Sequence, residues 1–171
     1  SWPTPTTTSS ACSLLASRPV DLKSAWAGCD GSASAVEQQY GAGMSALTEA
    51  EMHSIADRLL GAITAAHADA VREVYAPDAS IWHNFDEVDQ TVDQNLATLV
   101  DLHQRASGLQ YTEIRRLLAP GGFVQQHVLV GQAAGGPLHL PAMIRFWVEG
   151  GRITRLEEYL DTRQAMVLYA G

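Results

Sequence analysis

The most informative stretch of this sequence is GRITRLEEYLD, residues 151–161, in which Leu156 and Leu160 alternate with the charged or polar residues Arg155, Glu157, Tyr159 and Asp161. This period is typical of a β-strand with one face buried. The alternation places Glu158 on the same face as Leu156 and Leu160, among side chains that should lie in the interior. A carboxylate removed from water is costly unless it is paired. We therefore expect Glu158 either to have a partner or to have a pKa raised into the range useful for proton transfer.

The overall composition is that of an ordinary globular protein. The chain has 171 residues, of which 46% are hydrophobic and 18% charged, enough for one domain with a substantial core. Its formal net charge of -8 argues against a phosphate-binding surface, so nucleic acid is not expected as a partner. No apolar run is long enough to span a bilayer, so we expect no membrane association.

The first part of the chain, residues 1–43, is predicted to be a flexible extension rich in Ser, Thr, Ala, Gly and Pro. Both cysteines, Cys12 and Cys29, lie in it, so the folded domain expected over residues 44–171 does not depend on a disulfide. Met44 is a plausible natural start, which would make the extension non-native; a regulatory or docking tail is the alternative. The extension lacks the pattern of a secretory signal, so we expect a cytoplasmic protein.

The remainder predicts two helices, a strand, a third helix and then an antiparallel meander. A capping box at residues 48–51 begins the first helix, the second covers residues 68–74, and the third carries apolar residues from Val92 to Leu99. The strand between the second and third helices covers residues 78–84. Gly-rich turns separate four further strand-like runs. These runs cover residues 109–118, 123–130, 138–148 and 152–161.

This order of elements, together with YAPDAS at residues 75–80 and GRIT at residues 151–154, resembles the nuclear-transport-factor-like superfamily, and its SnoaL-like branch most of all. The resemblance implies an α+β, cystatin-like fold in which a curved antiparallel sheet wraps around helices and forms a cone-shaped pocket. It also implies a small hydrophobic ligand of polyketide or terpenoid type, no cofactor, and a homodimer.

Similarity to the ketosteroid isomerases, which share this cone, implies that His83 takes the place of that family's carboxylate base. The tyrosine and the acid of that family's oxyanion hole fall on Leu59 and Met143. The proton-donor pair is therefore absent, which disfavours steroid isomerisation. We expect Leu59 and Met143 to contact the substrate instead.

Similarity to the limonene epoxide hydrolases implies that their Asp-Arg-Asp triad falls on Glu158, Gln125 and His127. Their water-positioning tyrosine and asparagine fall on Trp82 and Asn84. Only the carboxylate and the asparagine amide keep their chemistry, and Gln125 replaces the cation that would bridge two carboxylates. The SnoaL-type polyketide cyclases also place their acid-base aspartate on Glu158, so two families converge on the carboxylate that the alternation indicates.

Two questions stay open at this stage. Glu158 and His127 could form an acid-base pair, or His127 could merely neutralise the carboxylate. In an ideal strand His83 faces away from Trp82 and Asn84, and the two families disagree about which side is turned inward. A bulge or a strand end would allow both.

We therefore predict a cofactor-independent, acid-base enzyme acting on a small apolar molecule, with no metal. The expected reaction is an isomerisation, an aldol-type cyclisation, a dehydration or an epoxide opening. The alternative is a non-catalytic ligand-binding or dimerisation module of the same fold, because no catalytic template is matched completely. The predicted catalytic residues are Glu158, His127 and His83, and the predicted substrate contacts are Trp82, Asn84, Gln125, Met143 and Leu59.

Overall fold

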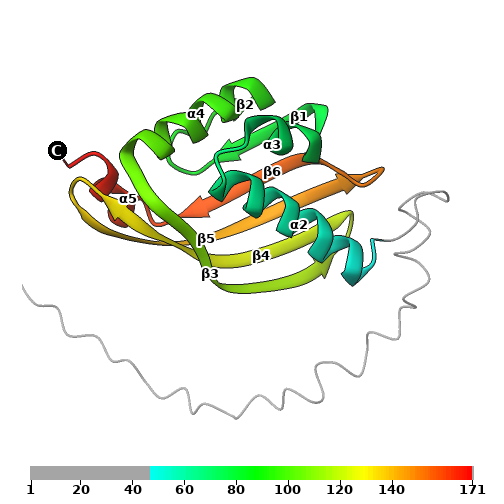
Figure 1. Ribbon diagram of the computed structural model, residues 1–171. Helices are drawn as coiled ribbons and strands as arrows, with labels where there is room; N and C mark the ends of the chain where they lie inside the picture. The colour runs from blue at the N-terminus through cyan, green and yellow to red at the C-terminus, as the bar shows by residue number, and fades with distance from the viewer. Residues whose placement is uncertain (1–46, 171) are drawn as a thin grey trace, which may run out of the picture. The chain divides into compact units, whose positions relative to one another are not determined.

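The computed structural model describes residues 47–170, in which three helices lie over one face of a six-stranded sheet (Figure 1). The sheet order is β2-β1-β6-β5-β4-β3. The predicted extension over residues 1–43 and both cysteines lie outside the described residues. The helices are α2 (Glu49–Thr64), α3 (Ala68–Val74), α4 (Val92–Arg105) and α5 (Thr162–Ala165), followed by a 3-10 turn, η1 (Met166–Leu168). The strands are β1 (Tyr75–His83), β2 (Asp89–Gln90), β3 (Ala106–Ala119), β4 (Gly122–Ala133), β5 (Gly136–Glu149) and β6 (Arg152–Leu160).

The predicted capping box at the start of α2 is confirmed. The Glu51 backbone N–H donates to the Thr48 hydroxyl at 3.2 Å, and the Thr48 N–H donates to the Glu51 carboxylate at 2.9 Å. A second capping box, between Thr91 and Gln94, begins α4. These caps satisfy backbone donors that have no partner inside the helix. No helix within residues 47–170 is long and apolar enough to cross a membrane.

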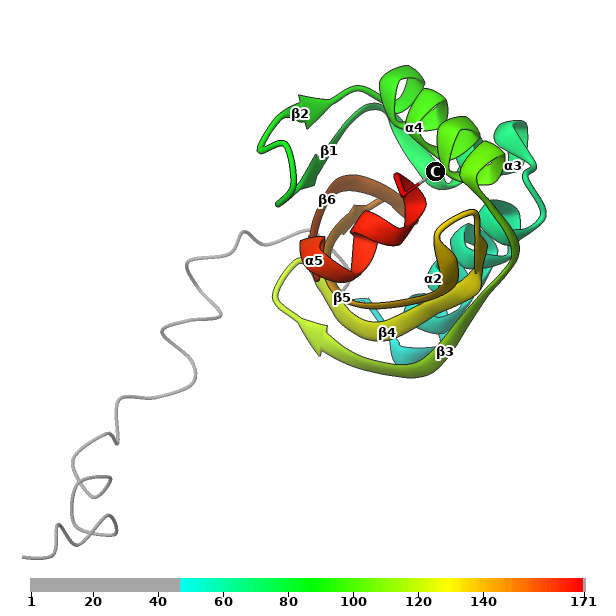
Figure 2. The same ribbon diagram turned by 90° about the vertical axis from the view of Figure 1, so that its left-hand side faces the viewer.

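The predicted antiparallel meander is confirmed as β3 to β6, and β1 then joins the outer side of β6 in a parallel pairing. The pairing of β3 with β4 is interrupted twice, near Gly108 and near Glu113, and both residues have a positive φ. Such irregularities bend a strand and increase its twist. In Figure 2 the sheet accordingly curls toward α4 and α5, which is the curvature implied by the resemblance.

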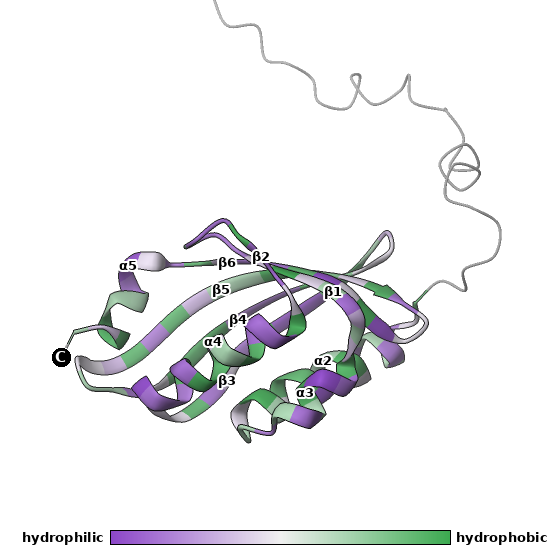
Figure 3. Cartoon of the chain, turned by 90° about the horizontal axis from the view of Figure 1, so that it is seen from above, coloured by the Kyte–Doolittle hydropathy of each residue, from purple (hydrophilic) through white to green (hydrophobic). Residues whose placement is uncertain are grey.

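The core lies between the helices and the inner face of the sheet. Hydrophilic and hydrophobic residues alternate along β5, so one face of this strand is apolar (Figure 3). At one end of the sheet Phe123 stacks on Phe146 with 4.4 Å between ring centroids, and both are fully buried. A second apolar cluster, which includes Leu109, Leu129 and Leu140, occupies the other end. Residues of both clusters line the cavity described below.

The sequence patterns did not indicate β2, α5 or η1. Asp161, which we placed at the end of the last strand, instead caps α5 by accepting hydrogen bonds from the backbone N–H groups of Arg163 and Gln164. This turn brings Thr162 and Ala165 to the cavity wall. A four-residue helix is too short to have a recognisable apolar period, which explains why the sequence patterns did not indicate α5.

Candidate active site

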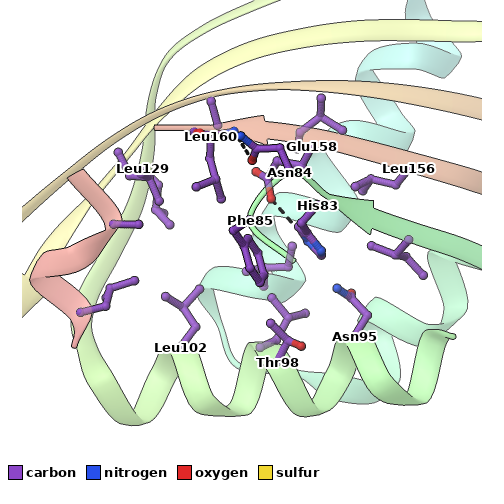
Figure 4. A pocket seen from close by; sticks show the side chains of 18 of the residues that line it. His83, Asn84, Phe85, Asn95, Thr98, Leu102, Leu129, Leu156, Glu158 and Leu160 are labelled. Atoms are coloured by element: carbon purple, nitrogen blue, oxygen red, sulfur yellow. Dashed lines mark hydrogen bonds and ion pairs between the residues drawn. The ribbon is translucent and has the colours of Figure 1, made fainter. Parts of the chain in front are cut away.

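A cavity of about 580 Å³ lies between the inner face of the sheet and helices α2, α4 and α5. Its volume falls in the range of small-molecule sites, and its wall is mostly apolar. Leucine and isoleucine side chains from helices and strands form much of this wall. The polar residues that line the cavity include Tyr75, His83, Asn84, Asn95, Tyr111, His127 and Glu158. Figure 4 shows several of these side chains converging around Glu158.

Strand register brings the polar residues together. Arg116 of β3 pairs with Gln125 of β4, and Gln125 pairs with Ile144 of β5. Ile144 pairs in turn with Glu158 of β6, and Glu158 lies beside His83 of β1. Paired residues on neighbouring strands share a face of the sheet. The inner face therefore carries one continuous row across five strands, in which Ile144 and His83 flank Glu158.

Glu158 faces two imidazoles. Its Oε2 lies 3.5 Å from His83 Nε2, and its Oε1 lies 3.9 Å from His127 Nε2. The Glu158 side chain is only 18% exposed, and both histidines are more deeply buried. Burial raises the pKa of Glu158 to about 7. The carboxyl is therefore divided between its acid and base forms near neutral pH, which is one of the two alternatives that the alternation in residues 151–161 predicts.

Both imidazoles are neutral at pH 7. Burial lowers the pKa of His127 to about 4, and burial also lowers the pKa of His83, against the opposing effect of the Asp86 carboxylate. A neutral imidazole does not act as a counter-cation, which disfavours a purely neutralising role for His127. Within residues 47–170, His83 Nδ1 is buried without a hydrogen-bond partner. Such an unpartnered atom costs about 1 to 3 kcal/mol.

The end of β1 resolves which side of this strand faces the cavity. His83 and Asn84 both line it, whereas Trp82 packs on the outer face against Tyr159, with ring centroids 5.2 Å apart. Strand β1 ends at His83, so the alternation does not continue into Asn84. The Asn84 amide donates to the Leu160 carbonyl at 3.1 Å and accepts from the Leu160 N–H at 3.0 Å (Figure 4).

Three of the predicted substrate contacts do not line the cavity. Trp82 and Met143 are on the outer face, where Met143 is 43% exposed, because their strand neighbours His83 and Ile144 point inward. Gln125 faces inward but does not line the cavity; it lies behind His127. Leu59 of α2 does line the cavity.

Sequence reasoning missed two tyrosines in the cavity wall. Tyr111 lies edge-on to the His127 ring, with centroids 4.9 Å apart, and Tyr75 is buried nearby. Neither hydroxyl has a hydrogen-bond partner among the described residues. Burial, and secondarily the Glu158 carboxylate, raises the pKa of both, so both hydroxyls keep their protons. Tyr111 shares a face with Leu109 in a strand-like run, a signal that could have identified it.

A family model described as a SnoaL-like domain matches residues 56–156. Similar solved structures include the pinacolase BvnE from Penicillium brevicompactum, with 11% identity and a TM-score of 0.61, covering 68% of this chain and 90% of that chain. They also include IdmH from Streptomyces antibioticus, described as a candidate polyketide cyclase. It has 15% identity and a TM-score of 0.60, and the match covers 69% of this chain and 97% of that chain. A third is a Catenulispora acidiphila protein with a ketosteroid isomerase-like fold, in complex with trimethylamine. It has 18% identity and a TM-score of 0.56, and the match covers 61% of this chain and 83% of that chain. No curated protein matches the chain. At these identities the neighbours confirm the expected fold.

Proposed function

The chain belongs to the SnoaL-like domain family, and on that premise we propose that it is a cofactor-independent enzyme that transfers protons on a small, largely apolar molecule. The observation that carries this proposal is Glu158, a carboxyl with a pKa of about 7 that faces two neutral imidazoles in an apolar cavity. A general base is most effective when its pKa lies near the working pH.

The cavity supports a substrate of polyketide or terpenoid type that carries a carbonyl group. The surface of its wall is mostly apolar, which suits a compact, mostly hydrocarbon molecule. The protonated hydroxyls of Tyr75 and Tyr111 are free to donate hydrogen bonds to the carbonyl oxygen. Donors aimed at the oxygen stabilise negative charge that develops there during reaction.

In the proposed reaction, the Glu158 carboxylate takes a proton from the carbon next to the carbonyl. The electron pair of that C–H bond moves onto the carbonyl oxygen and forms an enolate, to which the two tyrosines donate hydrogen bonds. Where the substrate carries a carbon–carbon double bond beside that carbon, the enolate is a dienolate, and return of the proton from Glu158 to its γ-carbon moves the double bond and completes an isomerisation. Attack of the enolate on a second carbonyl of the same molecule, followed by protonation of the new alkoxide, completes an aldol-type cyclisation.

Epoxide opening is less well supported by this site. The family that performs it uses an arginine between two carboxylates, and those positions hold Gln125 and His127 here. Arg116 approaches Gln125 but does not line the cavity. We therefore place isomerisation and cyclisation first, with dehydration after them.

Deuterium exchange tests this proposal without knowledge of the natural substrate. The full chain would be incubated in D₂O with a panel of cyclic and polycyclic enolisable ketones, and deuterium at the α-carbon would be followed by NMR. We expect faster exchange with the wild type, and a rate lower by about 10² to 10⁴ with Glu158→Gln, as is typical for loss of a general base. Glu157→Gln, the neighbouring residue on the outer face, is the matched control. Undiminished exchange with Glu158→Gln would refute the mechanism, and ketones that bind but never exchange would support the ligand-binding alternative.

We also propose that the protein forms a homodimer through the outer face of the sheet. Leu117, Met143 and Tyr159 are exposed apolar side chains on this face. Exposed apolar side chains on one face of a sheet can pack against the same face of a second copy. Sedimentation should give a dimer for the wild type and a shift toward monomer for Met143→Glu, whereas a wild-type monomer at all concentrations would contradict the assignment.

A further inference from the structure

We propose that Arg116 and Gln125 form a hydrogen-bonded relay that determines which ring nitrogen of His127 carries the proton. Through this relay His127 presents a permanent N–H to Glu158 and acts as a hydrogen-bond donor in the cavity. The inference deepens the proposed function, because it concerns the same site, but the proton position can be measured without any substrate.

The relay runs along two neighbouring strands. Arg116 Nε donates to Gln125 Oε1 at 2.8 Å, and Gln125 Nε2 lies 3.1 Å from His127 Nδ1. Arg116 and Gln125 are directly paired across β3 and β4, and His127 is two residues further along β4 on the same face. Gln125 is 0% exposed, so water does not compete for its amide.

The hydrogen-bonding chemistry of arginine fixes the orientation of the Gln125 amide and the tautomer of His127. A guanidinium only donates hydrogen bonds, so the Gln125 oxygen must face Arg116. The amide nitrogen of Gln125 then faces His127, and since that nitrogen only donates, His127 Nδ1 must accept. The proton of the neutral ring is consequently on Nε2. An amide orientation and a histidine tautomer are usually ambiguous in a structure, but here the donor at the head of the relay determines both.

Helix α2 holds Arg116 in place. Its Nη2 donates to Asp57 Oδ1 at 2.7 Å, and its Nη1 donates to His53 Nδ1 at 2.9 Å. The arginine side chain is only 4% exposed, although Asp57 is largely in solvent. With partners on both α2 and β4, the guanidinium is restrained from turning away from Gln125.

The consequence for the site is a division of roles between the two histidines. The polar groups that face His127 are Glu158 from β6, Tyr111 from β3 and Gln125 from its own strand. The only nitrogen of His127 that could accept a proton is turned away from the cavity and is occupied by Gln125. His127 is therefore a positioning donor and Glu158 the proton acceptor. His83, whose Nδ1 has no partner among the described residues, is not restrained in this way.

The test is long-range ¹H–¹⁵N NMR on the full chain with ¹⁵N-labelled histidine, at neutral pH and without ligand. The ¹⁵N shifts distinguish a protonated ring nitrogen from an unprotonated one. We expect His127 with unprotonated Nδ1 and protonated Nε2 in the wild type. In Gln125→Glu, a carboxylate should accept from both Arg116 and His127, so Nδ1 should become protonated and the pKa of His127 should rise by about 1 to 3 units, as beside an opposite charge.

The matched control is Gln126→Glu, which adds the same charge one residue away on the exposed outer face and should leave the His127 signals unchanged. A wild-type His127 protonated on Nδ1 would overturn the inference, as would a Gln125→Glu variant with an unchanged tautomer. The wild-type spectrum decides the tautomer even where the variant does not fold. If the tautomer is as expected and Glu158→Gln retains full activity, the proposed function fails while the relay stands.

Discussion

Replacing Glu158 with glutamine should stabilise the protein at alkaline pH even though it removes the proposed catalytic base. The carboxyl is largely buried, and its two nearest partners are neutral imidazoles that do not balance its charge. Glutamine has nearly the same size and can still hydrogen bond, but carries no charge. The folded protein is therefore relieved of a buried anion.

The size of the effect follows from the shift in the pKa of Glu158, from an ordinary value of 4.5 to about 7. Each pKa unit corresponds to about 1.4 kcal/mol, so the ionised carboxyl should destabilise the folded state by about 3 kcal/mol. Between these two values the folded protein holds a proton that the unfolded chain releases. The stabilising contribution of Glu158 is thus fully present below pH 4.5 and is lost as the pH rises through 7.

His127 has the opposite dependence, because burial lowers its pKa from 6.5 to about 4. Its contribution to stability is fully present above pH 6.5 and is lost as the pH falls toward 4. In the wild type the two slopes offset each other between pH 4.5 and 6.5. In Glu158→Gln the contributions of His127 and His83 remain without this offset, so the stability of the variant should rise with pH across this window.

Urea denaturation of both proteins at pH 4.5, 6 and 8 measures this difference. We expect equal free energies of unfolding at pH 4.5 and a variant more stable by about 3 kcal/mol at pH 8. Glu157→Gln, which loses only an outer-face ion pair with Arg155 at 2.7 Å, should change stability by less than about 1 kcal/mol. A Glu158→Gln difference that is the same at pH 4.5 and 8 would show that the carboxyl is well solvated and would refute the reasoning.

Two further substitutions test how the site is held. Asn84→Leu removes two hydrogen bonds to the Leu160 backbone and should lower the free energy of unfolding, measured by urea denaturation, by about 1 to 3 kcal/mol. A variant as stable as the wild type would mean that these two hydrogen bonds contribute nothing to stability. Gly122→Ala should prevent folding or lower the melting temperature sharply, because a methyl group there would collide with the Phe146 carbonyl across the β4–β5 pair. Gly61→Ala, at a helical glycine with open space around it, should be neutral or stabilising. Similar melting temperatures for the two variants would contradict this account.

The sequence predicted the local features of this fold well. Period-two alternation singled out Glu158, and the capping box located the first turn of α2, because both signals involve residues close together in the chain. The parallel pairing of β1 with β6 could not be read in the same way, since Ser80 and Arg155 are partners separated by most of the domain. Periodicity indicates that a strand exists but not which strand lies beside it.

The candidate site was predicted in part for a related reason. Similarity to a family transfers a position but not the direction of its side chain, which is why the ketosteroid isomerase comparison assigned Met143 to the substrate although its neighbour Ile144 faces inward. Gln125 was interpreted as a substrate contact because nothing in the sequence shows that Arg116 is its partner. Such roles depend on cross-strand neighbours, which become visible only once the register is known.

The most direct test of the central claim is a titration of the Glu158 side-chain carboxyl by ¹³C NMR in the full chain, assigned by comparison with Glu158→Gln. The account predicts a midpoint near pH 7, because burial raises the pKa of this group. A midpoint near 4.5, the ordinary value, would mean a solvated carboxylate with no advantage as a proton acceptor at neutral pH, and would contradict the account.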